Sequence, residues 1–238
     1  MEIENFIVSS QVWEKLEKYE PYYLLKVSDF SESLRVMKEI RDDTIKAEFI
    51  EDIAELFFKA YDTEYIKLPH RKMQKFNGDF FIMQDIEGKF VECKSSHVFK
   101  TIDKVALDYS LHKYNNEPYY PKHEDGQANK GYLHYCKANI LFCVNLAHKK
   151  IYIILDFQKL KSKILTMIEE GSGELEKYNI EYAYKQDGNK YSKIYMLDFR
   201  YLQDLGVDML EYNIANECDI LDLSNKKNTL GDQTLSIS

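Results

Sequence analysis

The feature that most restricts the fold of this sequence is a change of hydrophobic period after residue 61. Over residues 44–61 the apolar side chains recur at the 3.6-residue spacing of a helix that buries one face: Ile45, Phe49, Ile50, Ile53, Ala54, Phe57 and Phe58. The chain beyond this segment contains short apolar runs bounded by turn residues, which is typical of strands. The sequence therefore predicts an α/β fold in which this helix precedes a sheet.

Further elements can be assigned by the same criteria. The strands expected after the first long helix cover residues 65–68, 79–86, 89–94, 138–146 and 150–156, with a turn at Glu87 and Gly88 joining the second to the third. Residues 101–113 look helical, and residues 157–170 form a helix that ends at Gly171. Asp187-Gly188 predicts a late hairpin between residues 182–184 and 194–199.

The two ends of the chain differ in character from its middle. Near the N-terminus Ser9 or Ser10 can cap a helix that Pro21 stops, and residues 30–40 predict a second helix. From residue 201 onward the chain carries Asp204, Asp208, Glu211, Glu217, Asp219, Asp222 and Asp232 against only Lys226 and Lys227. We therefore expect an N-terminal helical extension over 1–43, a core over 44–200, and an acidic C-terminal segment over 201–238 with a disordered tail.

The charge balance limits how the chain could bind a polyanion. Its 32 Lys and Arg residues face 40 Asp and Glu residues, for a net charge of −8. This excludes a protein that holds nucleic acid by bulk positive charge, so any such site must be locally basic. The cysteines form no C-x-x-C pair, the N-terminus lacks the pattern of a signal peptide, and no apolar run is long enough to span a bilayer. We expect a cytoplasmic protein with no membrane segment.

The chemistry of the sequence concentrates in residues 77–96. Glu92 and Lys94 are two positions apart, so on a strand they share one face while Cys93 points into the core. Asp79 begins the neighbouring strand, and the turn between the strands could bring it beside Glu92. Two carboxylates, the Cys93 carbonyl and water form the kind of oxygen site that Mg²⁺ prefers, with Mn²⁺ as a substitute. Lys94 could then orient or help to deprotonate an attacking water. The alternative is an ordinary charged sheet face with screened ion pairs.

These residues carry a resemblance. Asp79, followed after twelve residues by Glu92-Cys93-Lys94 and preceded by a helix with glutamates, resembles the PD-(D/E)XK nuclease superfamily, which includes many restriction endonucleases, junction resolvases and phage or defence nucleases. The resemblance covers residues 44–156. It implies a restriction endonuclease-like core with a mixed central sheet flanked by helices, in the order helix, three-stranded antiparallel meander, helix and strand. Gly78 replaces the proline that the family has before the aspartate.

The family often places another acidic residue on the first helix, beside the metal. The candidates here are Glu48, Glu51 and Glu55. At about 100° per residue, Glu51 lies at the edge of the buried stripe, whereas the other two lie closer to the opposite face. We therefore assign this role to Glu51.

Two stretches are candidate nucleic-acid contacts, the first because it is locally basic and the second because, by the resemblance, it precedes a strand that often borders the site. His70, Arg71, Lys72 and Lys75 stand just before Asp79, and Gln127 and Lys130 end the long loop over residues 114–131. A solvated loop face is the alternative for the first stretch, and a dimer arm is the alternative for the loop. The six histidines lack zinc-ligand spacing, and no nucleotide-binding or serine-hydrolase motif is present.

The sequence thus predicts a Mg²⁺-dependent endonuclease of restriction, phage or defence type. Asp79 and Glu92, with the Cys93 carbonyl, would hold the metal, Lys94 would assist the water, and Glu51 would support the site from the helix. DNA is the expected substrate, and a homodimer is expected by analogy with the family. The alternatives are an RNA endonuclease with the same metal site and a catalytically silent nuclease fold that acts as an interaction module.

Overall fold

The computed structural model describes residues 3–18, 43–69, 74, 76–84, 87–99, 102–113, 130–187 and 190–219. Their helices and strands follow one another in this order: β1 (Glu4–Val8), α1 (Ser10–Leu16), α3 (Asp43–Ala60), β2 (Tyr65–Lys67), β3 (Phe80–Gln84), β4 (Glu87–Phe99), β5 (Ile102–Lys113), α5 (Tyr132–Tyr135), β6 (Ile140–Asn145), β7 (Lys150–Ile154), α6 (Phe157–Glu170), α7 (Ser172–Lys177), β8 (Glu181–Asp187), β9 (Lys190–Asp198), the short 3₁₀ helix η1 (Phe199–Tyr201) and β10 (Met209–Asn216).

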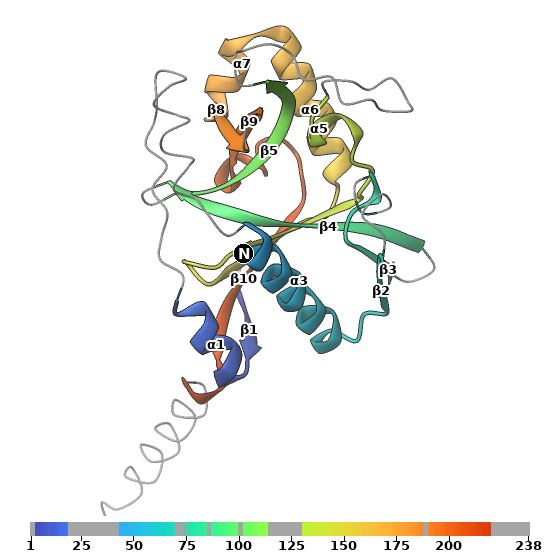
Figure 1. The fold of residues 1–238 in the computed structure, drawn as a ribbon, viewed down its shortest axis with the longest axis vertical. Helices are drawn as coiled ribbons and strands as arrows, with labels where there is room; N and C mark the ends of the chain where they lie inside the picture. Colours follow the sequence, from blue (N-terminus) through green and yellow to red (C-terminus); the bar gives the residue numbers. More distant parts are fainter. Residues whose placement is uncertain are drawn as a thin grey trace, which may run out of the picture.

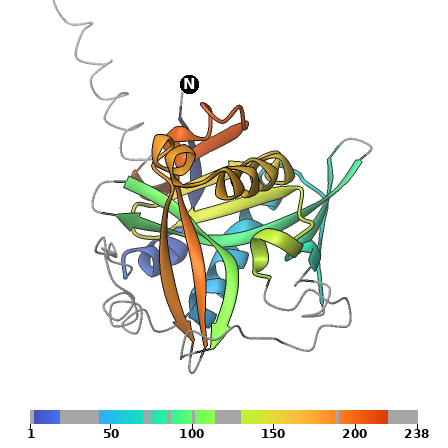
Figure 2. The same cartoon turned by 90° about the horizontal axis from the view of Figure 1, so that it is seen from above.

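The strands form a curled mixed sheet with helices on both sides (Figure 1). Among the described residues the strand order is β1-β10-β7-β6-β4-β5-β9-β8, and β2 and β3 join β4 as an antiparallel meander. β6 runs parallel to β4, and β1 runs parallel to β10. In Figure 2 the strands β5, β8 and β9, in light green and orange, run across the direction of β6 and β7, in yellow. The predicted mixed α/β class with a central sheet between helices is therefore correct.

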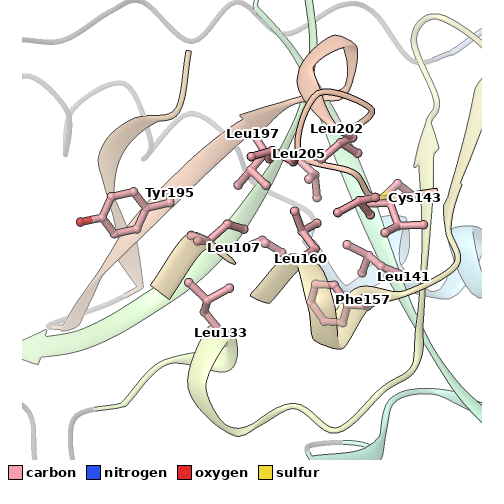
Figure 3. Packing of buried hydrophobic residues seen from close by; sticks show 14 of the residues in the cluster. Leu107, Leu133, Leu141, Cys143, Phe157, Leu160, Tyr195, Leu197, Leu202 and Leu205 are labelled. Carbon is pink, nitrogen blue, oxygen red and sulfur yellow. The ribbon is translucent and has the colours of Figure 1, made fainter. Parts of the chain in front are cut away.

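Each face of the sheet is covered by its own apolar cluster. The amphipathic stripe predicted over residues 44–61 forms α3, and its side chains pack with Phe80, Val91 and Phe142 on one face. Helix α6 covers the other face through Phe157, Leu160, Ile164 and Met167. Figure 3 shows leucines of β5, β6 and α6 converging in this second cluster. Because both faces are buried, β6 is apolar at nearly every position, as expected for a central strand.

Residues 101–113 were predicted to be a helix, and this prediction is wrong. They form β5, which pairs with β9 from Lys104 to Lys113. The segment satisfies two periods at once: Ile102, Val105, Ala106 and Tyr109 have helical spacing, while Val105, Leu107 and Tyr109 alternate. Pairing with β9 decides between them, because strand formation depends more on cross-strand neighbours than on local preference.

The predicted turn at Glu87 and Gly88 is also wrong, since both residues belong to β4. Gln84 pairs with Glu87 and Met83 with Gly88, so the connection lies at residues 85–86, outside the described residues. A Cβ on Gly88 would lie 2.1 Å from the ring of Phe81. The glycine therefore leaves room for a neighbouring aromatic ring and does not form the turn.

The late hairpin is confirmed, with Asp187 and Lys190 as its last paired residues. The helix ending at Gly171 is confirmed too, and Asp156 caps its start by accepting the backbone N–H of Lys159 at 2.9 Å. The predicted helix over residues 30–40 and residues 114–129 of the long loop lie outside the described residues.

The two ends of the described chain meet in the sheet. β1, which the sequence did not predict, pairs with β10 from Glu4–Tyr212 to Val8–Asn216. The predicted helix near Ser9 is present as α1, shorter than expected. The sheet thus extends into segments 3–18 and 209–219, although the domain boundaries at 43 and 200 remain predictions. Among the described helices none has the length and apolar character needed to cross a membrane.

Candidate functional site

The meander places Asp79 directly beside Glu92. Phe80 pairs with Val91, so one step before β3 Asp79 lies opposite Glu92. The backbone N–H of Asp79 donates to the Val91 carbonyl at 2.8 Å, and the Asp79 carboxylate accepts the Cys93 backbone N–H, also at 2.8 Å. These two bonds fix the aspartate at the edge of β4.

Gly78 makes this approach possible, and a proline could not take its place. Its φ of 105° is available to glycine, whereas the proline ring holds φ near −65°. A Cβ at Gly78 would also lie 2.5 Å from the Val91 carbonyl oxygen. Any larger residue at this position would push the chain away from β4 just before Asp79.

Glu92 and Lys94 lie on the face of β4 that is opposite α3, as strand alternation predicts. Val91 and Cys93 pack in the cluster of α3, whereas Glu92 and Lys94 face α5. Lys94 Nζ lies 2.7 Å from Glu92 Oε1, with the glutamate side chain 9% exposed and the lysine side chain 29% exposed. The glutamate side chain is therefore almost fully shielded from solvent, whereas the lysine side chain is partly accessible to it.

Burial and crowding of like charges change the titration of this site. Burial, and then the nearby charge of Glu92, raise the pKa of Asp79 to about 7, although the Cys93 N–H and Lys94 oppose the shift. Burial also raises the pKa of Glu92, against the attraction of Lys94. Burial alone would lower the pKa of Lys94, but Glu92, Asp108 and Asp79 outweigh it and raise that pKa. Among the described residues, the acids at this site outnumber the one ammonium, that of Lys94, which lowers the pKa values of Asp79 and Glu92.

Glu51 lies at the α3 side of the same site. Its charge adds to the raised pKa values of Asp79 and Glu92. Lys67 of β2 neutralises it, with Nζ 2.9 Å from Glu51 Oε2. The Glu55 carboxylate accepts hydrogen bonds from Lys67 and from the Tyr65 hydroxyl, at 3.2 Å each, and Glu48 is exposed. Of the three helix glutamates, Glu51 is therefore the one whose charge reaches Asp79.

The residues at this edge fit a divalent cation that prefers oxygen. The N–H and C=O of one strand residue point to the same edge, so the Cys93 carbonyl faces the side on which Asp79 lies. Asp79 and Glu92 each have one carboxylate oxygen engaged, by Cys93 and Lys94 respectively. In the described ranges no three His, Cys, Asp or Glu side chains form a ready-made metal cluster. Mg²⁺ requires no such cluster, because it retains waters and binds through one or two carboxylates.

Tyr132 of α5 belongs to the site and was missed by the sequence analysis. Lys94 Nζ lies 4.4 Å from the centroid of its ring, a cation–π contact that holds the lysine in place. Its hydroxyl is buried beside the Cys136 thiol, a weak hydrogen-bonding group, and has no well-formed hydrogen bond within the described part of the chain. Asp108 of β5 and Tyr135 of α5 complete the surroundings, since Asp108 raises the pKa of both Lys94 and Tyr135. In the sequence Tyr132 is one of several aromatic residues at the end of the long loop, and no pattern there indicates a contact with Lys94.

The predicted nucleic-acid contacts are described only in part. His70, Arg71, Lys72, Lys75 and Gln127 lie outside the described residues. Lys130 is described and exposed, and it forms an isolated bridge with Ser110 of β5. Its backbone leads through Gly131 directly into α5.

Comparisons of the chain with protein-family models, with curated proteins and with solved structures found no match.

Proposed function

We propose that the protein is a Mg²⁺-dependent endonuclease that hydrolyses phosphodiester bonds in DNA. The observation that carries the proposal is the grouping of Asp79, Glu92 and Lys94 at one edge of β4, with Glu92 buried and Asp79 half-buried opposite it. Buried like charges are costly unless a ligand uses them, and strongly shifted carboxyl groups cluster at functional sites.

The element order supports a restriction endonuclease-like core. α3, the antiparallel meander β2-β3-β4, and a later strand β6 parallel to β4 follow the order of that fold. The second helix expected from the family is absent between β4 and β6 in the described residues, where β5 and the short α5 stand. We therefore propose a divergent version of this core, in which α5 packs against Lys94.

In this proposal each side chain has a separate task. Asp79, Glu92 and the Cys93 carbonyl would hold Mg²⁺, which supplies charge stabilisation at a scissile phosphate and a more acidic water. Lys94, held by Glu92 and by the ring of Tyr132, would orient the attacking water through its ammonium protons. Glu51 would support the site from α3 while Lys67 limits its negative charge. A homodimer that cuts both strands is proposed by analogy with the family only.

The test is cleavage of plasmid, branched and single-stranded DNA and of RNA, with Mg²⁺, Mn²⁺ or EDTA. We expect Asp79→Asn, Glu92→Gln and Lys94→Met each to reduce the metal-dependent rate at least about 100-fold. Glu55→Gln is the matched control and should retain activity, because Glu55 lies on α3 and pairs with Lys67 as Glu51 does, but its other carboxylate oxygen accepts the Tyr65 hydroxyl.

The outcomes separate the proposal from its alternatives. Cleavage of RNA alone would replace the DNA substrate but keep the metal site. A rate that the three substitutions leave unchanged would show a contaminating nuclease, and a folded protein that cleaves none of the substrates would be a silent interaction module. Either of these two results contradicts the proposed enzyme.

A further inference from the structure

A second group of side chains lies across α5 from Lys94. Tyr132 and His134 are two positions apart on this helix, so they point in roughly opposite directions. Tyr132 contacts Lys94, whereas the ring of His134 lies 4.8 Å from that of Tyr109 of β5. Lys193 and Tyr195 contact Tyr109, Tyr182 contacts both of them, and Lys130 bridges the next residue of β5, Ser110. We call Tyr109, Lys130, Tyr182, Lys193 and Tyr195 the lysine–tyrosine surface.

Strand register places its two lysines in one row. Lys130 bridges Ser110, and Ser110 pairs with Lys193 of β9. Directly paired residues project from the same face of a sheet, so both lysines flank Ser110 on one face. With strands about 4.8 Å apart, the two lysine backbones lie about 10 Å from each other.

Three tyrosine rings surround the ammonium of Lys193. Its Nζ lies 4.5 Å from the ring centroid of Tyr182, 5.2 Å from that of Tyr195 and 5.9 Å from that of Tyr109. Tyr182 is 57% exposed. Tyr195 is buried, and Figure 3 shows its hydroxyl directed away from the leucines of the core.

Within the part of the chain that the structure describes, no acidic side chain pairs with these lysines. Among the described residues neither Lys130 nor Lys193 forms an ion pair with a carboxylate, unlike Lys67, Lys94, Lys104 and Lys150. In a chain with a net charge of −8, two unpaired ammonium groups beside exposed aromatic surface form a local site for an anion with planar groups. A nucleic-acid strand has both: phosphates for the lysines and bases for the rings.

We propose that the lysine–tyrosine surface binds an unpaired segment of a nucleic-acid strand, with a base stacked on Tyr182 and phosphates at Lys130 and Lys193. A duplex keeps its bases stacked on each other, so an aromatic platform of this kind favours unpaired nucleotides. The inference rests on the proposed function in one respect: the bound strand would continue past α5 to Lys94 and Glu92. It defines the substrate class as nucleic acid with a single-stranded portion.

The test measures binding without cleavage. Labelled single-stranded DNA and RNA and a duplex of the same sequence are titrated with the full chain in EDTA, and affinity is read from fluorescence anisotropy at several salt concentrations. We expect Lys193→Gln to weaken single-strand binding about tenfold and to lower the salt slope by about 0.7. We expect Tyr182→Leu to weaken it about tenfold with the salt slope unchanged.

Three control variants distinguish recognition from damage to the fold. Lys193→Arg and Tyr182→Phe keep the charge and the ring, so their affinities should stay within about twofold of the wild type. Lys177→Gln is the matched control, because Lys177 also lies over a tyrosine ring, 5.2 Å from that of Tyr178, but pairs with Glu174 at 3.9 Å. Its loss should leave affinity unchanged.

Equal affinity of all variants, an equal loss in Lys177→Gln, or tighter binding of the duplex would overturn the inference. Its failure is separable from failure of the proposed function. If the wild type cleaves DNA but Lys193→Gln and Tyr182→Leu bind normally, this surface is not the binding site and the enzyme stands. If Lys193→Gln and Tyr182→Leu bind weakly but the wild type never cleaves, the surface stands and the enzyme fails.

Discussion

At the scale of single residues, the site is defined by two carboxyl groups, those of Asp79 and Glu92, whose charged forms are disfavoured by burial. Asp79 is held beside Glu92 by two backbone hydrogen bonds, although burial and the charge of Glu92 raise the cost of charging Asp79. Much of this was accessible from the sequence, because Glu-x-Lys on a strand fixes which side chains share a face. The approach of Asp79 was left open there, since it depends on the register of β3 and on the backbone of Gly78.

The cost of charging Asp79 predicts a gain of stability when that charge is removed. Asp79→Asn keeps an oxygen for the Cys93 N–H but removes the negative charge, so in EDTA at pH 8 it should stabilise the protein by about 1–3 kcal/mol. The pKa of Asp79 is about 7 in the folded protein and 3.8 as its ordinary value, so the folded state binds the extra proton between them. Wild-type stability should therefore fall as pH rises from about 4 to about 7.

Urea unfolding of both proteins across this pH range measures the difference. The variant should lack the part of this fall that comes from Asp79 and keep the part that comes from the raised pKa of Glu92, and the two curves should approach each other near pH 4. A variant that is less stable than the wild type at pH 8 would contradict the account of a charge crowded at the site.

The ring of Tyr132 should matter to Lys94, and its hydroxyl should not. Tyr132→Phe keeps the cation–π contact and removes a buried hydroxyl whose polar contact is with the weakly hydrogen-bonding Cys136 thiol, so stability should be unchanged or higher. Tyr132→Leu removes the ring under the ammonium and should lower the cleavage rate by about tenfold. Steady-state kinetics should show this loss in kcat and not in KM, because Lys94 acts on the attacking water. Equal rates for the two variants would show that the ring does not position Lys94.

At the scale of elements, the site depends on how β5 and α5 pack together. The segment 101–113, predicted to be a helix, is the strand β5, whose pairing with β9 is irregular between Asp108 and Ser110. At this irregularity the backbone N–H of Gly131 donates to the Tyr109 carbonyl at 2.8 Å. α3 and α6 were predictable because each has one clear helical period, and β6 and β7 because each is a short continuous apolar run. The strand β5 was not predictable, because its sequence fits both a helix and a strand and only the pairing with the distant strand β9 decides between them. The same long-range dependence hid Tyr132 from sequence analysis.

Gly131 lies so close to β5 that a larger residue should destabilise the protein, and Gly173, which has open space around it, is the control position. A Cβ at Gly131 would lie 2.5 Å from the Asp108 carbonyl oxygen, so Gly131→Ala must push α5 away from β5 and should cost about 1–3 kcal/mol. Gly173 of α7 has open space around its Cβ position, so Gly173→Ala should be neutral or stabilising by up to about 1 kcal/mol. Thermal unfolding compares the two, and cleavage should fall in Gly131→Ala only. A Gly131→Ala protein with wild-type stability and rate would show that α5 does not need this close contact.

At the scale of the whole molecule, β1 joins the N-terminal segment to the central sheet. The sequence separated residues 1–43 from the core because their helical signals differ from the strands that follow. It could not reveal β1, since a five-residue strand beside a distant β10 has little local signature. In the structure Phe6 of β1 is buried, and its ring lies 5.2 Å from that of Phe57 of α3.

This integration predicts that the N-terminal strand unfolds together with the core. Phe6→Ala should cost about 3–5 kcal/mol, the usual penalty for removing a buried phenylalanine ring. The only tryptophan, Trp13, lies in α1, so its fluorescence reports the N-terminal segment while far-ultraviolet circular dichroism reports the whole fold. Both signals should change at the same temperature in the wild type, and both should shift downward in Phe6→Ala. A separate, earlier transition of Trp13 would show that the segment is an independent extension.

The most direct test of the central claim is the position of a bound divalent ion. In a crystal grown or soaked with Mn²⁺, the anomalous difference map should contain a peak between the carboxylates of Asp79 and Glu92 and next to the Cys93 carbonyl, and the same experiment on Asp79→Asn should show none. A wild-type map without a peak at this edge of β4, under conditions in which Mn²⁺ supports cleavage, would contradict the account.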